Sequence, residues 1–237
     1  MSPDPAHLVL HQHPFASFCQ KPLIALYELG LSFQAPIVAD EASRRALEEL
    51  SPLGKMPVLR VEPEDLTLPE STTIVEYVDR LTADRPRLVP DDPAAALQAR
   101  LWDRIFDAYV QLPMQKIVAD ALRPEGRGDA EGVADARRTL DTAYGVIEAK
   151  AAGGRWITGD AFTLADCAAA PALFYAHVVH PWDEEERPHL TRYYRDLMHR
   201  PSVARTIDEA KPYRELFPLP WPPHADDHRP PAADSAG

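Results

Sequence analysis

The chain has 237 residues, 45% of them hydrophobic, and a formal net charge of -12. This length allows one large domain or two modest ones, and the acidic balance argues against partners such as nucleic acid or an anionic membrane surface. No apolar run approaches the roughly 20 residues of a membrane-spanning helix, the N-terminus lacks the pattern of a signal peptide, and two cysteines make no disulfide scaffold. The chain is therefore expected to be cytoplasmic.

The first third of the chain alternates between strand-like and helix-like patterns in the order β-α-β-α-β-β-α. Apolar residues at helical spacing indicate the helices, and the second-last strand is entered through Pro57, which cannot donate a ladder hydrogen bond. The expected strands cover residues 7–12, 31–38, 57–62 and 66–69, and the expected helices cover 18–30, 40–52 and 70–81.

A segment rich in proline and aspartate, residues 82–94, has no periodicity and is predicted to be a linker. No convincing strand follows it. The expected helices cover residues 94–122 (bent near Pro113), 128–152, 162–179, 189–200 and 201–210. The helix at 162–179 is apolar on nearly all sides, which is typical of a buried helix. The proline-rich end is expected to wrap the surface and then become disordered.

Three stretches in this order carry a resemblance to a known family. They are "SPLGKMPVL" (51–59), "LPESTTIVEYVD" (68–79) and "FTLADCAAAPALF" (162–174). Together with the layout, they resemble the cytosolic glutathione transferase family over about residues 7 to 215. In that family the first stretch leads into a cis-proline, the second opens the third helix with an acidic residue and a serine, and the third is a buried helix with a capping box.

The resemblance implies a fold of two parts. Residues 1–82 would form a thioredoxin-like domain with a mixed four-stranded sheet, residues 83–93 a linker, residues 94–216 an all-helical bundle domain, and 217–237 a tail. It also implies a homodimeric detoxification enzyme that uses glutathione as co-substrate.

Glutathione carries an ammonium and a carboxylate at its γ-glutamyl end, and the start of the helix at residue 70 suits both charges. Glu70 is a partner for the ammonium, while the N–H groups and dipole at Ser71 suit the carboxylate. Glu70 and Ser71 also fit a simple helix cap, but Pro57 upstream favours binding. Met56 would offer its backbone to the cysteinyl part by strand-like pairing. Lys55 could approach the glycine carboxylate, although a solvated loop lysine is the plainer interpretation.

The reaction centre is expected in "HQHPFASFCQK" (11–21), where the first strand meets the first helix. A hydroxyl donor aimed at the glutathione sulfur favours the thiolate, and Ser17 is the natural donor. Cys19 is its rival, as a nucleophile that forms a mixed disulfide, or else a small packed residue. Ala16 falls where several classes of the family keep their catalytic serine or cysteine.

The second substrate is expected in a cleft between the domains. The candidates to line it are Phe15, Trp102, Phe106, Tyr109 and Met114, although an aromatic stripe at helical spacing is more often core. Thr163 and Asp166 fit a structural capping box. No cluster of residues has metal-ligand spacing, so no metal is expected.

The resulting prediction is an enzyme that binds glutathione, stabilises its thiolate and adds it to a small hydrophobic electrophile. Three alternatives remain open on the sequence: a Cys19-dependent thiol transferase or reductase, a glutathione-dependent isomerase, and a non-catalytic glutathione-binding or stress-response module that Ala16 keeps in consideration.

Overall fold

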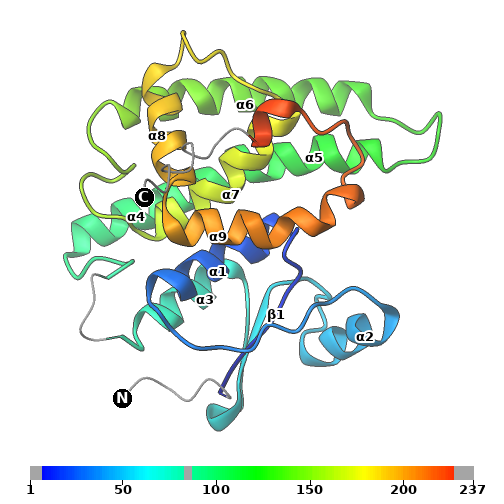
Figure 1. The fold of residues 1–237 in the computed structure, drawn as a ribbon, viewed down its shortest axis with the longest axis vertical. Helices are drawn as coiled ribbons and strands as arrows, with labels where there is room; N and C mark the ends of the chain where they lie inside the picture. The colour runs from blue at the N-terminus through cyan, green and yellow to red at the C-terminus, as the bar shows by residue number, and fades with distance from the viewer. Residues whose placement is uncertain (1–6, 83–86, 227–237) are drawn as a thin grey trace, which may run out of the picture.

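The first third of the chain contains a small antiparallel sheet in a computed structural model that describes residues 7–82 and 87–226 (Figure 1). The strands are β1 (Leu8–His11), β2 (Val58–Val61) and β3 (Leu66–Pro69), in the spatial order β1-β2-β3. Leu10 pairs with Leu59, and Leu59 pairs with Leu68. Leu10 and Leu59 are fully buried, so this register directs the apolar face of the sheet into the core.

The segment 31–38 differs from the regular strand that its apolar residues predict. It runs parallel to β1 but makes only two isolated bridges, Val9 to Gln34 and Gln12 to Ile37. The backbone N–H of Leu10 donates to Gln34, and that of Gln34 donates to Leu8, both at 2.8 Å. Pro36 has no N–H to extend this ladder. The expected four-stranded mixed sheet is therefore three antiparallel strands with an irregular fourth segment beside β1.

Three helices accompany the sheet, namely α1 (Ser17–Glu28), α2 (Glu41–Leu50) and α3 (Ser71–Asp79). Helices α1 and α3 pack against each other, and α1 also contacts the second half of the chain. Helix α2 lies apart from them in Figure 1 and begins with a capping box between Asp40 and Ser43. Its single buried residue, Leu47, packs with Val38 and Val58 in a small core of its own.

The second half of the described chain is helical, as predicted. Its helices are α4 (Pro93–Ile105), α5 (Leu112–Ala121), α6 (Ala130–Ala151), α7 (Leu164–Val179), α8 (Pro188–Met198) and α9 (Pro201–Ala210). Every residue of α7 is buried, and α7 contacts α1, α4, α5 and α8. The apolar character of this helix on all sides therefore corresponds to its place at the centre of the bundle (Figure 1).

The predicted bend near Pro113 takes the form of a π-helical turn. This turn, Phe106–Gln111, joins α4 to α5. Proline at 113 lacks the N–H that would bond to the carbonyl of Tyr109 four residues earlier, and the wider turn lies directly before it. Such turns inside α-helices are rare and frequently accompany functional sites.

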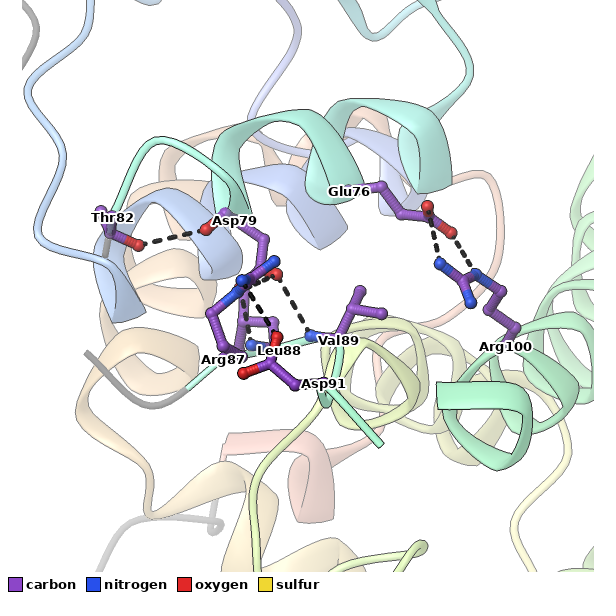
Figure 2. A network of polar contacts seen from close by, with 8 residues as sticks. All are labelled: Glu76, Asp79, Thr82, Arg87, Leu88, Val89, Asp91 and Arg100. Atoms are coloured by element: carbon purple, nitrogen blue, oxygen red, sulfur yellow. Dashed lines mark hydrogen bonds and ion pairs between the residues drawn. The ribbon is translucent and has the colours of Figure 1, made fainter. Parts of the chain in front are cut away.

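A network of polar contacts ties the end of α3 to the chain that leads into α4 (Figure 2). The buried Asp79 carboxylate accepts hydrogen bonds from the Leu88 N–H at 2.7 Å and from Arg87 Nε at 2.8 Å. Arg100 of α4 makes a two-pronged ion pair with Glu76 of α3, at 2.7 and 3.1 Å. These contacts link α4 and the segment before it to the helix that begins at Ser71.

The start of α7 has the capping box expected from the sequence, formed by Thr163 and Asp166. The fully buried Asp166 carboxylate also accepts from the Ile157 N–H at 3.1 Å and from the Tyr193 hydroxyl at 2.7 Å. Burial raises the pKa of this carboxyl, while its hydrogen-bond donors act in the opposite direction. The role of these residues is structural, because they join α7, α8 and the loop before α7.

Over residues 7–82 and 87–226, no helix has both the length and the apolar character needed to cross a bilayer. The same residues contain no group of three or more His, Cys, Asp or Glu side chains arranged to hold a metal ion.

Candidate functional site

A cavity of about 600 Å³ lies where the loop before β2, the start of α3 and the start of α1 meet. All five residues predicted to bind glutathione line this cavity: Lys55, Met56, Pro57, Glu70 and Ser71. Ala16, Phe18, Leu53, Gly54, Pro69, Leu112 and Gln115 complete its lining. We call it the larger cavity.

Glu70 directly precedes α3 and has an unusual backbone conformation. Its φ angle is +74°, in a region that residues other than glycine rarely adopt and that is often found at functional sites. Its exposed side chain makes no capping hydrogen bond to the helix. A simple helix cap therefore does not account for this glutamate. Glu70 directly precedes Ser71, where the helix start presents N–H groups and the positive end of its dipole.

The loop before β2 supplies the opposite wall. The Met56–Pro57 peptide bond is cis, and Gly54 has a φ of +59°. Pairing of β2 begins at Val58, so the backbone of Met56 lies outside the ladder and borders the cavity. The side chain of Lys55 is exposed.

A second cavity, of about 340 Å³, adjoins the first and is mostly apolar. It is lined by Phe15, Ala16, Ser17, Met114, Gln115, Val118, Ala119, Leu122, Tyr175, Leu216, Phe217 and Pro218. Ala16 and Gln115 line both cavities, so the two spaces meet at the start of α1. We call this one the smaller cavity.

Ser17 is the first residue of α1 and lies at this junction with 7% of its surface exposed. Its Oγ accepts a hydrogen bond from Nε2 of Gln111, the last residue of the π-helical turn. The residue before it, Ala16, provides no side-chain cap, so the helix start presents its N–H groups to the same space. A hydroxyl and a helix N-terminus thus converge where the two cavities meet.

Cys19 is placed differently from Ser17, although it is only two residues away. Its side chain is 0% exposed and lines neither cavity. Burial raises the pKa of its thiol to about 12, so the thiolate that attacks disulfides does not form near neutral pH. The geometry therefore favours Ser17 over Cys19 as the group that faces a bound sulfur.

The structure brings only some of the predicted second-substrate residues to a cavity. Phe15 and Met114 line the smaller cavity, whereas Trp102 and Phe106 are packed in the core and Tyr109 is 56% exposed. The rings of Trp102, in α4, and Phe106, in the π-helical turn, are tilted against each other with their centroids 6.0 Å apart. They follow the more common pattern, in which aromatic residues at helical spacing belong to the core.

Part of the smaller cavity comes from the C-terminal segment, which the sequence interpretation left out of the site. Leu216, Phe217 and Pro218 line it, and Phe217 and Trp221 contact Phe15 at 6.1 and 6.2 Å between ring centroids. The described part of the predicted tail therefore packs over the start of α1. The aromatic residues among its prolines were the available signal. The expectation of disorder falls on residues 227–237, which lie outside the described residues.

A buried charge cluster beside the site was also not found from the sequence. Lys21 of α1 is 1% exposed, and its Nζ lies 2.5 Å from Asp103 Oδ1 and 3.0 Å from Asp107 Oδ2. It also donates to Thr72 Oγ1 at 2.7 Å. Burial raises the pKa of the Asp103 carboxyl, and the Lys21 cation opposes this rise. The cluster joins α1 and α4 to the first turn of α3.

Comparison with known families gives two matches. The model of the glutathione S-transferase N-terminal domain matches residues 10–86, and that of the C-terminal domain matches residues 130–196. Among curated proteins, glutathione S-transferase GstB of Escherichia coli is 28% identical over 194 residues, which cover 79% of this chain and 91% of that protein. A glutathione S-transferase of Hyoscyamus muticus is 28% identical over 210 residues, covering 84% and 97%.

Solved structures of glutathione S-transferases are also similar to this chain. A glutathione S-transferase of Methylobacterium radiotolerans in complex with glutathione sulfonate has a TM-score of 0.73 and 29% identity, covering 85% of this chain and 95% of that one. One of Methylobacillus flagellatus with glutathione bound has a TM-score of 0.74 and 25% identity, covering 84% and 98%.

Proposed function

The chain belongs to the cytosolic glutathione S-transferase family, and on this premise we propose that it conjugates glutathione to a small, largely apolar electrophile. Glutathione occupies the larger cavity and the electrophile occupies the smaller one. The observation that carries the proposal is the junction of the two cavities at Ala16 and Gln115, directly beside Ser17.

The γ-glutamyl end of glutathione binds at the start of α3. Its ammonium pairs with the Glu70 carboxylate, and its carboxylate accepts hydrogen bonds from the first turn of the helix at Ser71. The cysteinyl part pairs with the backbone of Met56, which lies outside the β2 ladder. Lys55 stands on the same wall, where its ammonium suits the glycine carboxylate. This arrangement brings the sulfur to the junction of the cavities.

Catalysis requires a thiolate, because a free thiol with a pKa near 8.5 is mostly protonated at neutral pH. Lowering this pKa by about two units takes roughly 2.7 kcal/mol of preferential stabilisation. The Ser17 hydroxyl and the N-terminus of α1 supply it by donation to the sulfur. The thiol proton passes to water. The thiolate then forms a carbon–sulfur bond to the electrophile, and in a substitution the leaving group departs with its electron pair.

The apolar walls of the smaller cavity support an apolar second substrate. The Tyr175 hydroxyl there already donates to the Phe15 carbonyl at 3.2 Å and accepts from Gln20 at 3.1 Å. The smaller cavity therefore suits the binding of a neutral, hydrophobic compound. A thiol transferase that uses Cys19 is less favoured, because that thiol is buried and protonated. A cytoplasmic location and a role in detoxification stay predictions from the sequence and the resemblance.

The proposal is tested by steady-state conjugation of glutathione to an activated aryl halide. S-methylglutathione is the matched control, since it keeps the binding groups but has no thiol to ionise. We expect turnover with glutathione and competitive inhibition by S-methylglutathione. If both compounds bind and no conjugate forms above the uncatalysed rate, the non-catalytic binding module is the better interpretation. If the protein reduces disulfides instead, the thiol-transfer alternative is the better interpretation.

We further propose a homodimer that uses the outer face of α4. Leu97 and Leu101 lie one helical turn apart on α4, and they are 64% and 47% exposed. Leu53, beside the larger cavity, is also 64% exposed. Neighbouring exposed apolar side chains, such as Leu97 and Leu101, are typical of an interaction surface.

Replacing Leu101 with glutamate is expected to shift the protein to monomers, because a charge would be buried in the proposed interface. Sedimentation of the wild type and of Leu101→Glu measures the shift. Val146→Glu on α6 is the control, since Val146 is 49% exposed and lies on another helix. A wild type that sediments as a monomer contradicts the homodimer.

A further inference from the structure

We propose that Gln111 is a positioning residue, which turns the Ser17 hydroxyl so that it donates its hydrogen to the glutathione sulfur. This inference rests on the function proposed above and adds to it a residue from the helical half of the chain. Gln111 touches neither cavity, so it would act through Ser17 and not on glutathione itself.

The contact between these residues is almost completely enclosed. Gln111 is 2% exposed and Ser17 is 7% exposed. Nε2 of Gln111 donates to Ser17 Oγ across 94 residues of sequence. Over the part of the chain that the structure describes, Ser17 Oγ has no other hydrogen-bond partner. The serine oxygen accepts from Gln111, so its single hydrogen remains for another acceptor.

The acceptor for this hydrogen is expected in the cavities beside Ser17. Its neighbour Ala16 borders both cavities, and Ser17 itself borders the smaller one. A thiolate at their junction is an anionic acceptor, and hydrogen bonds to charged groups are stronger than those between neutral groups. The structure thus assigns a chain of donation from the Gln111 amide to the Ser17 hydroxyl and from there to the sulfur.

The reverse orientation of the amide would cancel this effect. If Oε1 of Gln111 faced Ser17, it would take the hydroxyl hydrogen, and the sulfur would lose its donor. Among residues 7–82 and 87–226, the buried Oε1 has no hydrogen-bond partner, and reversal would leave the NH₂ group unpaired instead. Without glutathione, both orientations of the Gln111 amide therefore make the same number of hydrogen bonds. The bound thiolate selects the orientation in which Gln111 donates.

The local fold explains why a glutamine reaches this place. Gln111 closes the π-helical turn Phe106–Gln111, whose extra residue rotates the following side chains by about 100° about the helix axis. Phe106 and Val110 of the same turn are fully buried. A polar amide among them is costly unless it is hydrogen-bonded, and Ser17 is the partner that it finds.

Two substitutions test the inference. The readouts are the pH profile of kcat/KM for the electrophile at saturating glutathione, and the ultraviolet absorbance of the bound thiolate. Gln111→Glu replaces the donor with an acceptor that takes the Ser17 hydrogen, and we expect the pKa of bound glutathione to rise by about one unit or more. With bound glutathione at a pKa of about 6.5 in the wild type, a rise of one unit lowers the thiolate fraction at pH 7, and with it kcat/KM, by about threefold. Gln111→Met, which is similar in size and has no donor, should raise the pKa by a smaller amount. The KM for glutathione should stay within about twofold, because the residues that bind it are elsewhere.

A double-mutant cycle separates positioning from a general structural effect. In a Ser17→Ala background, Gln111→Met should leave the thiol pKa unchanged, because the hydroxyl through which it acts is gone. The inference is overturned if Gln111→Met leaves the pKa of the wild type unaltered, or shifts it equally with and without Ser17. Thermal unfolding of each variant shows that it is folded. A wild type that binds no glutathione would instead overturn the proposed function, so the two failures are distinguishable.

Discussion

Replacing Ser17 with alanine is expected to lower kcat/KM for conjugation by up to about 25-fold at pH 7, because the thiolate fraction of bound glutathione falls as its pKa rises from about 6.5 toward 8.5. The hydroxyl is removed while the helix start remains, so the pKa of bound glutathione should move back toward 8.5. The pH dependence of kcat/KM measures both effects. The loss should shrink as the pH rises, because above the thiol pKa the thiolate forms without assistance.

Cys19→Ala is the matched control, since it changes a neighbouring residue of the same helix. Cys19 is buried and lines neither cavity, so conjugation should be nearly unaffected and only stability should fall slightly. The opposite result, with activity lost in Cys19→Ala and kept in Ser17→Ala, would contradict the mechanism and favour the thiol-transfer alternative.

Replacing Lys21 with methionine is expected to destabilise the protein by about 3–5 kcal/mol at pH 7, because it leaves two buried carboxylates without their cation. Lys21 lies 2.5 Å from Asp103 and 3.0 Å from Asp107, and burial already raises the pKa of Asp103. Chemical denaturation of the wild type and of Lys21→Met gives the difference in the free energy of unfolding. The control is Arg45→Met, which removes an exposed ion pair with Glu41 and should cost less than about 1 kcal/mol.

The loss in Lys21→Met should depend on pH in a defined direction. Lys21 lowers the pKa of Asp103 in the wild type, so removing it raises the folded-state pKa further above the unfolded value. A carboxyl group whose pKa is higher in the folded state than in the unfolded state loses its proton more readily on unfolding. The free energy of unfolding therefore falls as the pH rises from the unfolded-state pKa to the folded-state pKa. The difference between the two proteins should therefore be smaller at pH 5 than at pH 7. An equal difference at both values would contradict the account of the cluster.

The parts of the site that the sequence predicted are those encoded in short stretches. Pro57, Glu70 and Ser71 lie in motifs that begin a strand or a helix, and their geometry follows from turn and helix-start chemistry within a few residues. They line one cavity because β2, β3 and α3 follow each other closely along the chain. The segment 31–38 departed from its strand pattern, because Pro36 interrupts its ladder.

What the sequence did not predict depends on contacts between distant segments. Lys21 and Asp103 are far apart in sequence, and a lysine in a short helix is normally assigned to the surface. Gln111 reaches Ser17 only because a π-helical turn rotates it, and no periodicity marks such a turn. Trp102 and Phe106 have the spacing of a lining stripe, but both are buried in the core. Part of the lining of the smaller cavity comes from residues 216–218, far along the chain from the other lining residues.

The most direct test of the whole account is calorimetry of glutathione binding to the wild type and to the Glu70→Ala, Ser71→Ala double variant. Glu70 makes no capping bond to α3, so its loss should remove a ligand contact without melting the helix, and thermal unfolding checks this. We predict that the wild type binds and that the double variant loses at least about tenfold in affinity, which is about 1.4 kcal/mol. No binding by the wild type at millimolar glutathione, or equal binding by both proteins, would contradict the placement of glutathione in the larger cavity.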